Sequence, residues 1–179
     1  MKKIKSAEKS KKIINKTKII IKKKIDNNKA DKKEINLGVN KKGKFIFLEH
    51  TADIKFQAFG KSLEEAFKNS ALAVADTMYK NKVEKKISKK IEIYGKDEGS
   101  LLYNFLDEII YLFDAEHFLT SDIKNLKINQ KNVFILNAEL IGDKSKKYKI
   151  LEHIKSVTYS EMAVKKEKGR FTTQVVLDI

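Results

Sequence analysis

Two short apolar strands, the turn between them and the capped helix after them limit the folds open to this chain more than any other feature. Residues 45–48 are all apolar, and residues 54–59 alternate apolar with other residues at the period of two that a strand requires. The turn between them is Glu49-His50-Thr51-Ala52-Asp53. Ser62, with Glu65 three residues later, is the signature of a capped helix start. Two strands followed by a helix favour a fold built from both.

Apolar residues at intervals of three and four predict a helix from Ser62 to about Tyr79. Its predicted buried face consists of Leu63, Ala66, Phe67, Ser70, Val74 and Met78. A second helix is predicted over residues 100–118. Its apolar side is broad, which indicates close packing against a sheet.

The rest of the chain is predicted to form strands. One precedes the second helix, at residues 86–94, and the others are expected at residues 123–129, 132–141, 148–151, 153–164 and 170–177. Turns are predicted at Gly142-Asp143-Lys144 and Lys168-Gly169. The predicted fold class is therefore α+β, with two helices packed on a mostly antiparallel β-sheet.

The positive charge of the chain is concentrated in its first quarter. Residues 1–44 carry 17 lysines and four acids, whereas residues 45–179 carry 22 basic and 20 acidic residues. Residues 1–43 also lack aromatics and bury too little apolar surface to offset ordering entropy. We therefore predict a disordered Lys-rich extension at 1–43 and one folded domain at 44–179. The alternative for the extension is an arm that tethers RNA without sequence preference, or one that targets the protein.

Several classes of site and location are disfavoured by composition. The chain has no cysteine, so it can form neither a disulfide nor a thiolate metal site. No apolar run reaches the roughly 20 residues of a membrane helix or the about 7–15 of a secretory signal. The cytoplasm is the default location, and the basic tail would also suit nuclear or organellar delivery.

Carboxylates are the main candidates for chemistry. Asp53 closes the turn between two strands, and Asp178 with the terminal carboxylate of Ile179 ends an apolar strand. Hard divalent cations bind clusters of such oxygens. The alternatives are that Asp53 hydrogen-bonds its own backbone and that Asp178 is a solvated charge. Spacing alone does not bring Asp53 and Asp178 together.

Other polar residues offer weaker signals. Strand alternation puts Lys155 and Tyr159 on one face, either as a surface pair or as part of a face that binds anionic groups. His50, His117 and His153 do not have metal-ligand spacing. No phosphate loop, catalytic triad or zinc signature is present, so the residues themselves indicate no enzyme.

Four blocks of sequence, in order, resemble the archease family. They are Phe47-Leu48-Glu49-His50-Thr51-Ala52-Asp53 with the following Ser62-Leu63-Glu64-Glu65-Ala66-Phe67, then Ser100-Leu101-Leu102-Tyr103-Asn104-Phe105-Leu106-Asp107-Glu108, then Ile154-Lys155-Ser156-Val157-Thr158-Tyr159-Ser160-Glu161-Met162, and finally Leu177-Asp178-Ile179. Together they span about residues 45–179. The chain has Ser160 where many family members carry His.

The resemblance implies a function that composition does not show. Archeases are small metal-binding proteins that assist the GTP-dependent RtcB-type RNA ligase in tRNA splicing and RNA repair. They promote guanylylation of the ligase and its multiple turnover, contact tRNA only through the ligase, and do not join RNA themselves. Carried over, the divalent metal (calcium, magnesium or manganese) would be held by Asp53, Asp178 and Ile179. Lys155, His50, Thr51 and Tyr159 would contact the partner or a phosphate.

Two other functions are compatible with the sequence. A scaffold or chaperone-like protein would bind its partner without metal and would tolerate replacement of the carboxylates. An RNA-binding module would act through the Lys-rich tail, and its affinity would fall steeply with salt.

Overall fold

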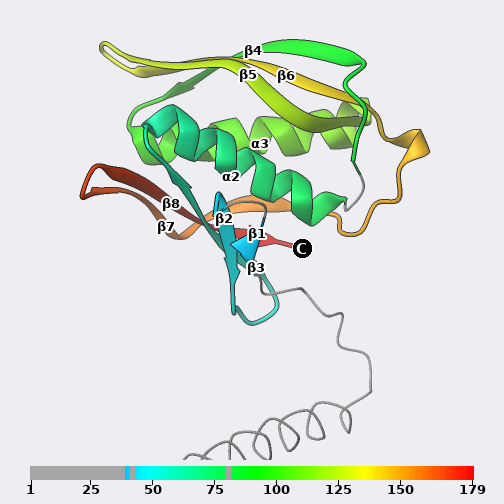
Figure 1. Ribbon diagram of the computed structural model, residues 1–179, viewed down its shortest axis with the longest axis horizontal. Coiled ribbons are helices and arrows are strands. Elements are labelled where there is room, and N and C mark those ends of the chain that lie inside the picture. The colour runs from blue at the N-terminus through cyan, green and yellow to red at the C-terminus, as the bar shows by residue number, and fades with distance from the viewer. Residues whose placement is uncertain (1–38, 41–42, 80–81) are drawn as a thin grey trace, which may run out of the picture. The chain divides into compact units, whose positions relative to one another are not determined.

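The structure is a computed structural model that describes residues 39–40, 43–79 and 82–179 (Figure 1). The predicted extension, residues 1–43, therefore lies almost entirely outside the described residues. Among the described helices, none is long and apolar enough to cross a membrane.

Five strands form the larger sheet, in the order β1-β2-β3-β8-β7, and all neighbours in it are antiparallel. Their bounds are β1 Val39–Asn40, β2 Phe45–Leu48, β3 Ile54–Gly60, β7 Ser156–Glu167 and β8 Arg170–Asp178. β8 therefore lies between β3 and β7, although more than 100 residues separate it from β3 in sequence.

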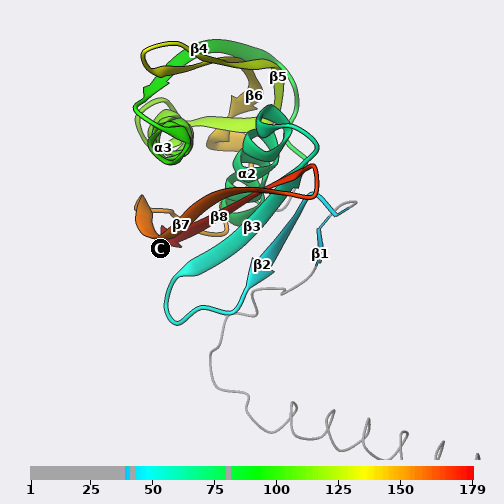
Figure 2. The same ribbon diagram turned by 90° about the vertical axis from the view of Figure 1, so that its left-hand side faces the viewer.

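A second sheet has the order β4-β6-β5, and its strands are also antiparallel. They are β4 Ile87–Gly95, β5 Phe118–Gln130 and β6 Phe134–Lys144. Helices α2 (Leu63–Met78) and α3 (Glu98–Glu116) lie between the two sheets (Figure 2). The predicted α+β class is confirmed, but its strands form two sheets with the helices as a middle layer.

The core is formed where both helices meet both sheets. Phe56 of β3, Phe67 of α2, Phe105 of α3 and Phe118 of β5 have no more than 1% of their surface exposed. The rings of Phe67 and Phe105 stack with centroids 6.3 Å apart, which joins the two helices. Burying side chains of this size contributes about 2–3 kcal/mol each relative to exposure.

Both helices begin at a side-chain cap, as sequence predicted for one of them. The Ser62 hydroxyl accepts a hydrogen bond from the Glu65 amide at 3.2 Å, and Glu65 in turn accepts one from the Lys61 amide at 2.7 Å. α3 starts two residues earlier than predicted, because Asp97 caps it by accepting from the Ser100 amide at 2.7 Å.

Two local predictions are wrong. The turn expected at residues 142–144 belongs to β6 instead. A Cβ on Gly142 would lie 1.8 Å from the Leu119 carbonyl oxygen, so this glycine permits close strand contact rather than a turn. The strand expected at 148–151 is reduced to one bridge, between Tyr79 and Ile150, after a short 3₁₀ helix at Ser145–Lys147. The turn at Lys168-Gly169 is confirmed.

Asp122 ties β5 to α2 and to the segment before β4. Its carboxylate accepts from Lys85 Nζ at 2.6 Å and lies 2.9 Å from Lys68 Nζ, with 24% of its side chain exposed. Burial raises the pKa of Asp122, but the hydrogen bonds from Lys85, Lys68 and the Ile123 amide outweigh it and lower the pKa to about 2. The folded state therefore favours the charged form of this carboxyl.

We expect Asp122→Asn to lower the free energy of unfolding at pH 7 by about 1–2 kcal/mol, since a pKa unit corresponds to about 1.4 kcal/mol before solvent screening. Because the folded pKa is below the unfolded value, this stability is present above about pH 4 and is lost as pH falls toward 2. Urea unfolding of both proteins at pH 7 and near pH 2 measures the difference. Asp114→Asn, on the exposed side of α3, is the control. An equal deficit at both pH values would contradict the assignment.

Candidate functional site

The start of β3 and the end of β8 bring two predicted carboxylates to one edge of the larger sheet. Ile54 of β3 pairs with Leu177 of β8. Asp53 comes directly before this pair on one strand and Asp178 directly after it on the other, so antiparallel pairing puts both at the same edge. Their side chains are 34% and 45% exposed. Both can therefore reach a solvent-borne ligand.

The turn that leads to Asp53 has an unusual backbone. Ala52 has a φ of 68°, in the left-handed region that residues with a side chain seldom occupy. Such conformations cost about 1–3 kcal/mol and persist where the surrounding structure holds them. Here the left-handed residue directly precedes Asp53, and the ladder with β8 begins at the next residue, Ile54.

Lys155 lies beside the end of β8. Its amide donates to the Asp178 carbonyl at 2.9 Å, which extends the pairing of β7 with β8 by one residue. Its ammonium donates to a main-chain oxygen of Ile179 at 2.8 Å and lies 3.7 Å from the Asp178 carboxylate. One lysine thus contacts two of the three predicted metal-binding residues. Its side chain is 68% exposed and free to turn toward solvent.

His50 joins the turn to β7. Its Nδ1 lies 3.6 Å from an Asp53 carboxylate oxygen, and its Nε2 lies 3.4 Å from Glu161. The imidazole therefore faces one carboxylate on each side. His50 is therefore placed next to Asp53, as expected for a residue of the same site.

Glu161 is a residue of this site that sequence reasoning missed. It lies in an irregular part of β7, with a φ of 53°, and accepts from Lys55 Nζ at 2.5 Å. This hydrogen bond lowers the pKa of Glu161 most, and the charges of Lys55 and His50 lower it further. The pKa therefore stays below its ordinary value. The bend cannot be recognised from strand alternation, and the only available signal was its position in the block of residues 154–162.

Tyr159 packs against helix α3 and not against the carboxylates. Its ring is 60% exposed and stacks on Tyr103 of α3, with centroids 4.4 Å apart and planes 2° from parallel. Thr51 is exposed at the tip of the turn. Neither side chain makes a described contact with Asp53, Asp178 or Lys155, so the site core consists of the other predicted residues.

The donor set suits a hard cation only in part. Among the described residues, no three His, Asp or Glu side chains gather as a ligand set. Two carboxylates and the Ile179 oxygen are the available donors, and all are oxygen, the ligand type that Ca²⁺, Mg²⁺ and Mn²⁺ prefer. A bound ion would complete its coordination with water or with groups of a partner.

The folded part of the chain is similar to known proteins. Residues 45–179 match the profile of the Archease protein family (MTH1598/TM1083). A Pyrococcus furiosus protein archease is 42% identical over 73% of this chain and 95% of its own length. One from Pyrobaculum calidifontis is 37% identical over 80% of this chain and all of its own length.

Solved structures have the same fold. The solution structure of Methanobacterium thermoautotrophicum protein 1598 is 34% identical, covers 76% of this chain and 99% of its own, and has a TM-score of 0.68. The crystal structure of a Thermotoga maritima archease, described as a possible chaperone, has a TM-score of 0.51 at 20% identity, over 74% of this chain and 94% of its own.

Proposed function

Because this chain belongs to the archease family, we propose that it is an accessory protein that activates a GTP-dependent RtcB-type RNA ligase, and that it does not join RNA itself. It would promote guanylylation of the ligase and allow repeated rounds of joining in tRNA splicing and RNA repair. The observation that carries the proposal is the meeting of Asp53 and Asp178 at one edge of the larger sheet. The family resemblance supplies the identity of the partner.

In this proposal the sheet edge holds a divalent cation, which could be calcium, magnesium or manganese. Asp53, Asp178 and the Ile179 oxygen would bind it. Nucleotidyl transfer requires divalent cations that neutralise charge developing on phosphate, and this is the chemistry the cation would supply. The donors come from a strand end and a tight turn, so their positions are largely fixed before the ligase binds.

The other residues have roles set by their contacts. Lys155 presents an exposed ammonium beside Asp178, suited to a phosphate or a partner carboxylate. His50, held between Asp53 and Glu161, would orient Asp53. Thr51 and Tyr159 are exposed and would contact the ligase surface. The acidic edge would thus dock at the entrance of the ligase active site.

The test is ligation by the cognate RtcB-type ligase with RNA in excess over enzyme, in the presence and absence of this protein. We expect the ligase alone to stop after about one round and the mixture to continue for many rounds. If folded protein leaves an active ligase at one round, the activator proposal is wrong.

The two rival functions predict different behaviour. A scaffold or chaperone-like partner would still act after Asp53 and Asp178 are replaced, because it needs no metal. A tail-dependent RNA-binding module would lose both its RNA affinity and its salt dependence when residues 1–43 are removed.

A further inference from the structure

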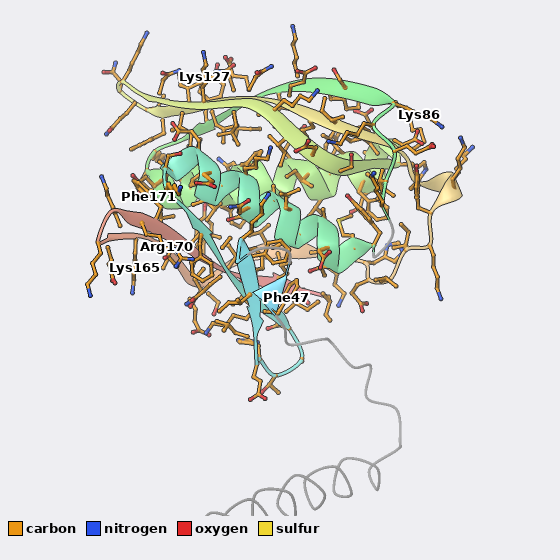
Figure 3. The ribbon with its side chains drawn as sticks, in the orientation of Figure 1. Phe47, Lys86, Lys127, Lys165, Arg170 and Phe171 are labelled. Atoms are coloured by element: carbon orange, nitrogen blue, oxygen red, sulfur yellow. The ribbon has the colours of Figure 1, made fainter. Side chains whose placement is uncertain are left out.

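The hairpin between β7 and β8 ends in a strongly basic tip. Its sequence is Lys165-Lys166-Glu167-Lys168-Gly169-Arg170, and all six residues are exposed. We call Lys165, Lys166, Lys168 and Arg170 the basic hairpin tip. Figure 3 shows Lys165 and Arg170 together at one end of the molecule, far from Lys86. Residues 45–179 as a whole are close to neutral, so this tip is a local concentration of charge.

The described carboxylates of the fold do not neutralise these cations. Six lysines elsewhere in the described domain do pair with carboxylates: Lys55, Lys68, Lys85, Lys86, Lys89 and Lys155. Within the part of the chain that the structure describes, no residue of the basic hairpin tip forms an ion pair. Four unpaired positive charges around one acid, Glu167, attract an anionic partner.

The backbone makes the tip rigid. Glu167 pairs with Arg170, so only Lys168 and Gly169 form the loop. Both are left-handed, with φ of 49° and 76°. Two consecutive left-handed residues are typical of the tight type I′ hairpin turn, which matches the twist of its strands. The lysines are therefore presented on a fixed frame rather than on a loose loop.

Aromatic rings hold two of the cations in place. The Arg170 guanidinium lies 4.1 Å from the centre of the Phe59 ring, and Lys166 Nζ lies 5.1 Å from that of Phe171. Stacking on a ring leaves the edge of a guanidinium open for two parallel hydrogen bonds to a phosphate. Arg170 is the only arginine in a chain with 39 basic residues, so the one guanidinium group of the chain lies at this tip.

We propose that the basic hairpin tip itself binds the phosphate backbone of single-stranded RNA, in addition to the contact through the ligase that the family resemblance implies. The choice of RNA as the anion rests on the proposed function, in which the ligase partner acts on RNA. The tip and Asp178 lie at opposite ends of β8, about 26 Å apart at about 3.3 Å per residue. The acidic edge would engage the ligase while the tip holds RNA strands near it. The tip carries no apolar side chain to insert into a lipid surface.

The test uses the full-length chain and a short fluorescent single-stranded RNA of mixed sequence, without ligase. The variant Lys165→Gln/Lys168→Gln is compared with Lys146→Gln/Lys149→Gln, which removes two exposed lysines near the 3₁₀ helix. Affinity is measured from about 50 to 200 mM salt. We expect the tip variant to bind about tenfold more weakly near 100 mM, with a salt slope smaller by about 1.4, while the control matches wild type.

A second variant, Arg170→Lys, keeps the charge but loses the planar guanidinium that can donate two parallel hydrogen bonds. We expect its salt slope to match wild type and its affinity to fall several-fold. If the tip variant matches the Lys146/Lys149 control in affinity and slope, the proposal is wrong. It is also wrong if the tip variant loses binding to anionic phosphatidylserine vesicles but not to RNA.

A further measurement, ligase guanylylation without RNA, separates this proposal from the proposed function. Ligase guanylylation without RNA does not involve the tip, so the tip variant should promote it as well as wild type. Absence of stimulation by every protein, wild type included, would count against ligase activation. Normal stimulation with unaltered RNA affinity of the tip variant would count against RNA binding by the tip alone.

Discussion

Replacing Asp53 and Asp178 together by asparagine is expected to return the ligase to about one round of joining, even with the protein in excess. Asparagine keeps the shape of each side chain but removes both negative charges that would hold the cation. Loss of an outer-shell partner alone typically costs 10–100-fold in metal affinity, so loss of two direct ligands should cost at least about 100-fold. Multiple-turnover ligation and calorimetric titration with Ca²⁺ or Mn²⁺ measure the two effects.

Stability should change little in this double variant. Asp178 contacts Lys155 at the surface, and exposed pairs of this kind are worth about 0–1 kcal/mol. A thermal unfolding midpoint close to wild type would therefore show that the loss is functional. Asp107→Asn/Asp114→Asn, two exposed carboxylates on α3, is the matched control and should stimulate normally. If the Asp53/Asp178 variant is folded and stimulates as well as this control, the proposal that these two carboxylates hold a metal required for activation is wrong.

The largest stability effect is expected for Phe105→Ala. Phe105 is fully buried on α3 and stacks on Phe67 of α2, so its removal leaves a cavity between the two helices. Truncations of this kind cost about 3–5 kcal/mol, a large part of the 5–15 kcal/mol by which a domain is stable. Denaturant unfolding should show this loss as a lower midpoint with an unchanged slope.

Tyr111→Ala tests whether the effect comes from burial. Tyr111 lies on the same helix, but 57% of its surface is exposed. We expect a change within about 0.5 kcal/mol, as is usual for surface positions. Equal losses in the two variants would mean that the helix itself, rather than the packing of its buried face, limits stability.

The helices were the most predictable part of the fold, because their signals are local. Residues spaced by three and four gave α2 within one residue of its observed ends, and Ser62 caps it as predicted. The start of α3 was missed because Asp97 caps with Ser100 rather than with a Glu or Gln three residues on. The predicted cap signature was too narrow to recognise it.

Pairing between distant strands was less predictable. Alternation shows which residues share a face, but it does not say which strand lies alongside. The larger sheet is completed by β8, which lies between β3 and β7, while β4, β5 and β6 form the second sheet. The turn predicted at Gly142 was wrong for the same reason, since the close approach of Leu119 from β5 depends on how the two strands pair.

The same limit applies to the candidate site. Asp53 and Asp178 were named as candidates, but only the register of β3 with β8 puts them at one edge. Their metal binding remains a prediction. The resemblance placed Lys155 among the residues that contact the partner or a phosphate, and only the structure shows that it contacts Asp178 and Ile179. Glu161 required knowledge of the irregular backbone in β7, which no periodicity contains.

That irregular stretch also affects how the molecule meets copies of itself. β7 is an outer strand, and between Thr158 and Ala163 its ladder with β8 is broken. An unbroken outer strand of 12 residues would offer a long row of unpaired amides and carbonyls, a template for growth into aggregates. The break leaves only two short rows of unpaired amides and carbonyls on β7. The bend that delivers Glu161 to the site thus also disfavours edge-to-edge pairing between copies of the chain.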